Sequence, residues 1–147
     1  MAKAKQVNPW PSYEAVRDAM GETNDCTVVS LAQVLDVPYE AAHEAMARLA
    51  GREQGKGASP FPLAMMFPAV FVQVPLPRDG DITLAEFCRV HKVGRYWVGV
   101  DGHQLAVING KVVDHSRRVR RRVWNAHSVF RSKFEGFHPP LGLPAPS

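Results

Sequence analysis

The chain is poor in cysteine and has no long apolar run. Only Cys26 and Cys88 occur among its 147 residues, and two cysteines cannot build a disulfide framework, so both thiols are expected to be reduced. No segment approaches the roughly 20 apolar residues that span a bilayer. Residues 1–8 also lack the apolar stretch of a secretion signal. These absences argue against a membrane protein or a disulfide-rich secreted domain, and favour a cytoplasmic or virion location.

Metal-binding spacings are missing as well. The sequence contains no CxxC and no HxxxH pair, which are the usual local signatures of a zinc site. We therefore expect neither a metal nor another cofactor. A zinc site assembled from Cys26, His103 and Asp114 is a poorly supported alternative.

The remaining composition is that of one globular domain. Hydrophobic residues make up 46% of the chain, and this length supports a single core. Polar and proline-containing residues 1–11 are expected to form a flexible arm. Residues 12–134 form the predicted domain, and residues 135–147, rich in proline and glycine, form a tail.

Positive charge is concentrated near the C-terminus. The net charge is +4 and the isoelectric point is about 9.3. The basic residues of this region are Arg117, Arg118, Arg120, Arg121, Arg122, Arg131 and Lys133. Such a cluster can attract nucleic acid or another anionic partner. We favour a solvated edge strand whose charges oppose aggregation, because no aromatic nucleic-acid-binding motif accompanies the arginines.

Helices are predicted in the first half of the chain, over residues 13–20, 26–35 and 38–50, with a fourth over 84–91. Ser12 is expected to cap the first, Asp36 or Val37 the third, and Thr83 with Glu86 has capping-box spacing before the fourth. Prolines between residues 58 and 77 exclude a long helix there, although a short strand over 70–74 fits. Strands follow over 95–100, 103–108 and 111–115, and strand-like alternation continues to residue 124. Helices followed by an antiparallel sheet indicate an α+β fold.

Cys26 is the first candidate for chemistry. Asn24 and Asp25 are helix-capping types, which places Cys26 in the first turn of an apolar helix. The free N–H groups and the positive end of the helix dipole favour a thiolate there. Taken alone, Cys26 is more simply a small core residue. Cys88 lies within a predicted helix beside Phe87 and is expected to be inert.

The hairpin around Asn109-Gly110 supplies possible partners. A two-residue loop at this site fixes the strand register. The predicted pairs are Ile108–Lys111, Val107–Val112, Ala106–Val113 and Leu105–Asp114. His103 is then diagonal to Asp114 on the same face of the sheet, within reach of a long side chain. Asp114 can orient the imidazole, and His103 can take a proton from Cys26. His115 alternates to the other face and is the less favoured base.

These motifs resemble the papain-like cysteine peptidases. The similarity is greatest to compact bacterial domains that process double-glycine leader peptides, and to small uncharacterised phage proteins. It rests on Asn24-Asp25-Cys26, Gly94-Arg95-Tyr96 and Gly102-His103 followed by Asn109-Gly110, within residues 12–125. The resemblance implies that the Cys26 helix packs on a C-terminal antiparallel sheet. It also implies roles for Cys26 as nucleophile, His103 as general base and Asp114 as the residue that orients the base.

The family's oxyanion-binding Gln, several residues before the cysteine, is absent here. Met20 and Gly21 lie in that neighbourhood, so Asn24 and the Cys26 backbone N–H are the expected donors. Gln104 is the next candidate, although it should face away from His103. Loop 51–57 and the Met- and Phe-rich segment after it are expected to flank the cleft.

The resemblance predicts a phage-encoded thiol hydrolase of peptide or isopeptide bonds. Such an enzyme would act on a peptide or protein in the host cytoplasm or in the virion, without a membrane partner. The alternative is a catalytically inactive papain-like fold that binds a phage or host protein, because a fold does not fix a function. Nucleic-acid binding through Arg117–Arg122 is a weaker alternative.

Overall fold

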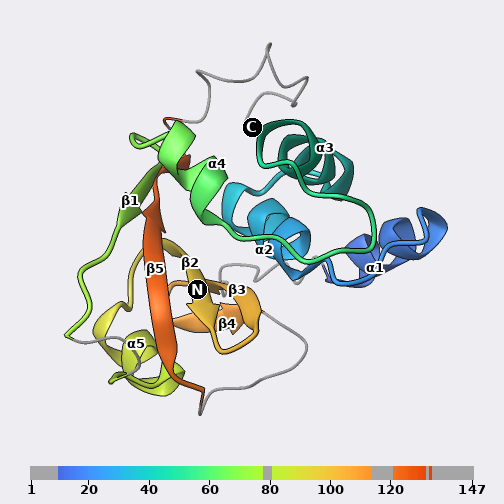
Figure 1. The fold of residues 1–147 in the computed structure, drawn as a ribbon. Coiled ribbons are helices and arrows are strands. Elements are labelled where there is room, and N and C mark those ends of the chain that lie inside the picture. Colours follow the sequence, from blue (N-terminus) through green and yellow to red (C-terminus); the bar gives the residue numbers. More distant parts are fainter. Residues whose placement is uncertain (1–9, 78–80, 114–120, 132, 134–147) are drawn as a thin grey trace.

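A five-stranded antiparallel sheet with helices on its two faces forms the architecture (Figure 1). The computed structural model describes residues 10–77, 81–113, 121–131 and 133. The helices in this part of the chain are α1 (Trp10–Ala19), α2 (Cys26–Leu35), α3 (Tyr39–Leu49), α4 (Phe61–Met66) and α5 (Leu84–Val90). The strands are β1 (Phe71–Gln73), β2 (Arg95–Val100), β3 (His103–Ile108), β4 (Lys111–Val113) and β5 (Val123–Val129). Their order in the sheet is β1-β5-β2-β3-β4. The predicted α+β class is confirmed.

Helix α2 lies at the centre of the molecule (Figure 1) and contacts β3, β2 and α3. Every residue from Thr27 to Leu35 is buried, as expected for a helix that is apolar on nearly all sides. The helix ends at Asp36, which adopts the left-handed conformation with φ of 57° and donates its N–H to the Ala32 and Gln33 carbonyls. This local geometry closes α2 where the sequence predicts an end.

Two of the predicted helix starts are wrong. Asp36 closes α2 and does not cap α3, which begins at Tyr39 after Pro38 as its N-cap. Proline suits this position because N–H groups at a helix start have no intrahelical acceptor, so the N–H that proline lacks costs the helix no hydrogen bond. Helix α1 begins at Trp10, so Ser12 lies inside its first turn and not at the cap. Residues 1–9 of the predicted arm and the predicted tail at 135–147 lie outside the described residues.

The segment rich in proline contains a short helix that the sequence did not predict. Helix α4 follows Pro60 and carries Pro62 in its first turn, where a missing N–H has no cost. The prolines therefore exclude only a long helix. Strand β1 follows, and it is one residue shorter at each end than the predicted strand over 70–74.

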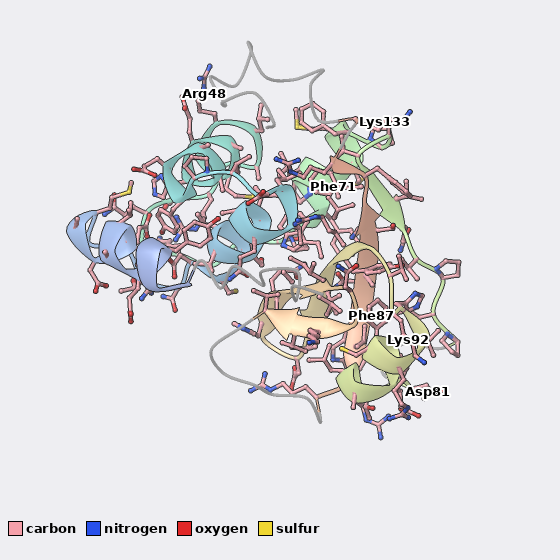
Figure 2. The ribbon with its side chains drawn as sticks, turned by 180° about the vertical axis from the view of Figure 1, so that it is seen from behind. Arg48, Phe71, Asp81, Phe87, Lys92 and Lys133 are labelled. Carbon is pink, nitrogen blue, oxygen red and sulfur yellow. The ribbon has the colours of Figure 1, made fainter. Side chains whose placement is uncertain are left out.

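Two apolar clusters pack on opposite faces of the sheet. Trp97 and Ala106 join the cluster formed with α2 and α3, to which Phe71 also belongs. Leu105 and Val107 alternate to the other face and join a cluster with Phe87 of α5. Figure 2 shows Phe71 on the side of the first helices and Phe87 beside α5. The sheet thus holds α2 against the face that carries Ala106.

The predicted hairpin register is confirmed over the described residues. Ala106, Val107 and Ile108 pair with Val113, Val112 and Lys111. Asn109 and Gly110 have φ of 51° and 76°, the left-handed values that a two-residue hairpin loop requires. The capping box of Thr83 and Glu86 is also present. Asp114 and His115, which the prediction placed in the same strand, lie outside the described residues.

No helix among the described residues is both long enough and apolar enough to cross a membrane.

Gly99 in β2 is the position where the sheet leaves least room for a side chain. A Cβ at Gly99 would lie 2.4 Å from Nδ2 and 2.9 Å from Cγ of Asn125, its register partner in β5. We expect Gly99→Ala to cost about 1–3 kcal/mol of unfolding free energy, since overpacking displaces neighbouring groups. Urea denaturation measures the loss. Gly57→Ala is the control, because nothing lies within 4 Å of a Cβ there. Equal stability of the Gly99→Ala and wild-type proteins would show that Asn125 moves without cost.

Candidate active site

Cys26 is the first residue of α2, as the sequence predicts. Asp25 precedes it as the N-cap, with φ of −110° and ψ of 28°, but its side chain makes no capping hydrogen bond. The backbone N–H of Cys26 therefore lies at the positive end of a buried helix, among groups that have no intrahelical acceptor. The Cys26 side chain is partly buried.

His103 and Gln104 at the start of β3 both contact the Cys26 sulfur. Burial of the thiol is the largest influence on its pKa and favours the neutral form. Hydrogen bonds from the His103 side chain and the Gln104 backbone N–H, together with the charge of His103, outweigh burial and lower the pKa of Cys26 below its ordinary value. In contrast, burial raises the pKa of Cys88 in α5. Cys26 thus has the lowered pKa expected of a nucleophilic cysteine, and Cys88 has the raised pKa expected of an unreactive core cysteine.

A tight turn sets the position of His103. Val100 pairs with His103 across the β2–β3 hairpin, and Gly102 in its loop has φ of 69°. His103 therefore emerges at the end of the sheet that lies nearest the start of α2. The structure brings together Cys26 and His103, which the sequence places 77 positions apart. The predicted third member, Asp114, lies outside the described residues.

Asn24, the predicted oxyanion donor, also borders the site. Its backbone is left-handed, with φ of 51°, and its side chain is exposed. Asn24 Nδ2 donates to the carbonyl oxygen of Gly55 at 2.9 Å. One of its two amide hydrogens thus links loop 51–57 to the segment that precedes Cys26. Loop 51–57 therefore touches Asn24 at the edge of the site, but neither this loop nor the Met- and Phe-rich segment after it supplies a residue that lines the cavity beside Cys26.

Asp25 has a structural role that the sequence did not reveal. Its carboxylate, 5% exposed, accepts hydrogen bonds from Arg17 Nε at 2.8 Å and Nη2 at 2.9 Å, and from the Tyr39 hydroxyl at 2.7 Å. Burial favours the protonated acid, but these partners lower the pKa of Asp25 below its ordinary value. The charge of Asp25 in turn raises the pKa of the neighbouring Cys26 thiol. Arg17 therefore offsets part of the charge of a carboxylate that opposes formation of the thiolate.

A second buried carboxylate, Glu22, anchors the loop before Cys26. Arg52 donates to both of its oxygens at 2.9 and 3.0 Å, and the Gly55 N–H donates at 3.0 Å. His43 Nε2 lies 2.5 Å from Glu22 Oε2. The hydrogen bonds from Arg52 are the largest influence and hold the pKa of Glu22 well below its usual range. Glu22 and Arg52 lie 30 positions apart in two loops, and nothing in the sequence indicated that they pair.

A cavity of about 260 Å³ opens beside Cys26. It is lined by Arg17, Asn24, Asp25, Cys26, Val29, Ser30, Gln33, Gly102, His103, Gln104 and Leu105. The Ser30 hydroxyl donates to the Cys26 carbonyl at 2.6 Å and accepts from Trp97 Nε1 at 2.7 Å, which holds this side chain in place. A thiol with a lowered pKa, an imidazole and a cavity of this kind can carry out acyl transfer. In the described part of the chain no three His, Cys, Asp or Glu side chains cluster closely enough to hold a metal ion.

The basic C-terminal region is described only in part. Arg117, Arg118 and Arg120 lie outside the described residues. Arg121 donates to the Asp101 carbonyl, and Arg131 Nε donates to the Leu35 carbonyl at 2.6 Å. Arg122 is exposed and forms a β-bridge with Thr83. Arg121 and Arg131 thus contribute to the fold, and nucleic-acid binding by the region stays a prediction.

Comparisons of the chain with protein-family models, curated proteins and solved structures found no match. The chemistry of the site is therefore inferred from its own residues: a cysteine at a helix start, a histidine at the start of β3 and an adjoining cavity.

Proposed function

We propose that the protein is a papain-like cysteine hydrolase that cleaves peptide or isopeptide bonds. The observation that carries the proposal is the hydrogen bond between the His103 imidazole and the Cys26 thiol at the start of a buried helix. The order of the residues, with the cysteine on an early helix and the histidine on a later sheet, agrees with the papain-like pattern. A phage-encoded enzyme that acts in the host cytoplasm or in the virion is the setting we propose.

The reaction divides into two acyl transfers. The Cys26 thiolate attacks the carbonyl carbon, and the carbonyl π electrons move to oxygen to give a tetrahedral intermediate. As the C–N bond breaks, the His103 imidazolium gives its proton to the leaving amine. Water then attacks the thioester while His103 accepts a proton from it, and the C–S bond breaks to release the acid and regenerate the thiol site.

The negative oxygen of each intermediate needs hydrogen-bond donors. The Cys26 backbone N–H is suited to this role because its position at the helix start leaves it without an intrahelical acceptor. Asn24 Nδ2 keeps a second hydrogen beyond the one given to Gly55. We propose these two groups as the oxyanion donors.

Asp114 completes the proposed site. The hairpin register predicted from the sequence pairs Asp114 with Leu105, and the described pairs of the same hairpin, Ala106 with Val113 among them, support that register. Leu105 and His103 share a face of the strand by alternation. In this role Asp114 would hold one ring nitrogen of His103 and leave the other for the thiol.

Alkylation by iodoacetamide tests the activated thiol. We expect Cys26 to react at least tenfold faster than Cys88 in the native protein near neutral pH, because a lowered pKa increases the thiolate fraction at that pH. The rate for Cys26 should also persist to lower pH than the rate for Cys88, whose pKa is raised. Mass spectrometry of peptides from a time course gives both rates.

His103→Ala supplies the matched control for this measurement. Loss of the hydrogen bond and charge of His103 should slow the alkylation of Cys26 and leave that of Cys88 unchanged. Native wild-type protein in which Cys26 reacts no faster than Cys88 would contradict the proposed nucleophile.

A non-catalytic binding protein with the same fold is the second candidate. It is favoured by one observation, the hydrogen bond that commits part of the Asn24 amide to Gly55. Such a protein would bind its phage or host partner equally well after Cys26→Ala, and would release no new amine from that partner. Cleavage that Cys26→Ala abolishes would decide for the hydrolase.

A further inference from the structure

Two of the residues that line the cavity beside Cys26 carry buried amide donors that the proposed reaction does not use. Gln33 and Gln104 both line the cavity and are 4% and 5% exposed. The Nε2 atom of each has no hydrogen-bond partner among the described residues. Unpaired buried donors are uncommon in folded proteins, and each lowers stability. Two in the wall of one cavity indicate a ligand that supplies the acceptors.

The two amides lie along a path that begins at the thiol. Cys26, Val29, Ser30 and Gln33 follow one another at helical spacing, so they share one side of α2. Gln33 is two turns from Cys26, about 10 Å along the helix axis. Gln104 approaches from β3, where its backbone N–H contacts the Cys26 sulfur. The cavity thus runs from the thiol toward Gln33, between the helix and the strand.

The volume fits one extended side chain. A cavity of about 260 Å³ is slightly smaller than the range of roughly 300–1,000 Å³ typical of sites for whole small molecules. Val29, on the side of α2 that faces the cavity, supplies an apolar wall for a methylene stem. The carboxamide nitrogens then require an acceptor near the end of that stem.

Charge selects the kind of acceptor. Arg17 is held by Asp25, and both carboxylate oxygens of Asp25 are bound by Arg17 and Tyr39. A substrate carboxylate would thus be buried close to the like charge of Asp25, whose guanidinium partner Arg17 is already engaged, and this is unfavourable. A substrate ammonium or guanidinium would face the N–H donors of Gln33 and Gln104, which offer a donor no acceptor. A neutral carbonyl oxygen satisfies both amides without introducing a charge.

We propose that this cavity is a specificity pocket for the carboxamide side chain of a glutamine or asparagine residue next to the attacked carbonyl. Gln33 and Gln104 donate to its side-chain oxygen, and Val29 packs on its methylene groups. Glutamine is preferred to asparagine because Gln33 lies far from the thiol. This inference rests on the proposed function for its place in catalysis, but binding in the pocket does not require a reactive thiol.

Binding is tested first in Cys26→Ala protein, which removes the thiol. N-acetylglutamine amide should shift the side-chain amide signals of Gln33 and Gln104 in ¹⁵N NMR spectra, while N-acetylmethionine amide, of similar length but without the acceptor, should leave them in place. Equal shifts with the two compounds, or none with either, would overturn the pocket. The result is independent of catalysis, so failure here and failure of the proposed hydrolase are distinguishable.

Selectivity is tested next with peptidyl vinyl sulfones that carry Gln, Met, Glu or Lys before the warhead. The thiolate adds to the β-carbon, and the α-carbon takes a proton from the His103 imidazolium. We expect the Gln probe to label Cys26 roughly 10- to 100-fold faster than the Met probe, because two donors gain a partner. Equal labelling rates in protein whose Cys26 reacts rapidly with iodoacetamide would overturn the pocket and leave the thiol site standing.

Gln33→Met and Gln104→Met test the donors themselves. Each should bring the Gln-to-Met rate ratio closer to one. Each should also raise the thermal midpoint of the free protein by about 2–4 °C, since an unpaired buried donor is removed. The exposed Gln73 in β1 provides a matched control, and Gln73→Met should alter neither quantity. A lower midpoint after both cavity substitutions would mean that the amides are paired within the fold, and would overturn the proposal.

Discussion

Replacing Arg52 by methionine is expected to lower the free energy of unfolding by about 3–5 kcal/mol, the usual effect of breaking a buried ion pair. The Arg52 and Glu22 side chains are 1% and 0% exposed. Methionine fills much of the space but leaves the Glu22 carboxylate without its guanidinium. It also removes the bond from Arg52 to the Thr23 carbonyl at 3.1 Å. Urea denaturation at pH 7 measures the change.

The dependence on pH separates lost charge compensation from lost packing. In the wild-type protein Arg52 lowers the pKa of Glu22, so the resulting stabilisation is complete above the unfolded-state pKa of about 4.3 and is lost as the pH falls below it. Without Arg52, burial favours the protonated form of Glu22, so the folded variant gains stability by binding a proton at this carboxylate as the pH falls. The deficit of Arg52→Met should therefore shrink between pH 7 and pH 5.

Arg52→Met combined with Glu22→Met provides the control. The double variant buries no uncompensated charge and should recover part of the stability that Arg52→Met loses, with little dependence on pH over the same interval. A deficit in the single variant that stays constant from pH 7 to pH 5 would mean that Arg52 acts through packing alone.

Local sequence codes account for most of the elements that carry the candidate site. Helix α2 was predictable because its apolar run begins after two capping-type residues. The β3–β4 register followed from Asn109-Gly110, since only a few residue pairs accept left-handed values at both loop positions. From these two elements alone, Cys26 and His103 could be proposed as partners. The boundary at Asp36 was less predictable, because aspartate can either cap the next helix or close the preceding one.

Features that depend on distant parts of the chain were not accessible from the sequence. Strand β5 lies between β1 and β2, an order that no local pattern specifies. Asp25 was recognised as a capping type, but its carboxylate turns to Arg17 and Tyr39 instead. The pairing of Glu22 with Arg52 depends on how two loops meet. Charged residues in loops are usually solvated, so the sequence favoured exposure for side chains that the fold buries.

Replacing Arg17 by methionine is expected to change both stability and thiol chemistry. The Asp25 carboxylate, 5% exposed, would keep only the Tyr39 hydroxyl among the side-chain donors described for it. Arg17 is 22% exposed, so we expect a loss near the lower end of about 3–5 kcal/mol. The uncompensated charge beside Cys26 should raise the pKa of the thiol, because Asp25 already acts in that direction. Alkylation of Cys26 by iodoacetamide should then slow several-fold at pH 7, while that of Cys88 stays unchanged.

The Asp25→Asn substitution in the same background distinguishes an electrostatic effect from a displaced helix start. Asparagine removes the charge but can keep the Tyr39 hydroxyl as a partner, so Arg17→Met with Asp25→Asn should restore rapid alkylation of Cys26. Its rate against pH should have a midpoint at or below that of the wild-type protein. If the double variant stays as slow as Arg17→Met, then Arg17 acts by positioning the chain before α2. A single variant with unaltered alkylation would show that the Asp25 charge does not reach the thiol.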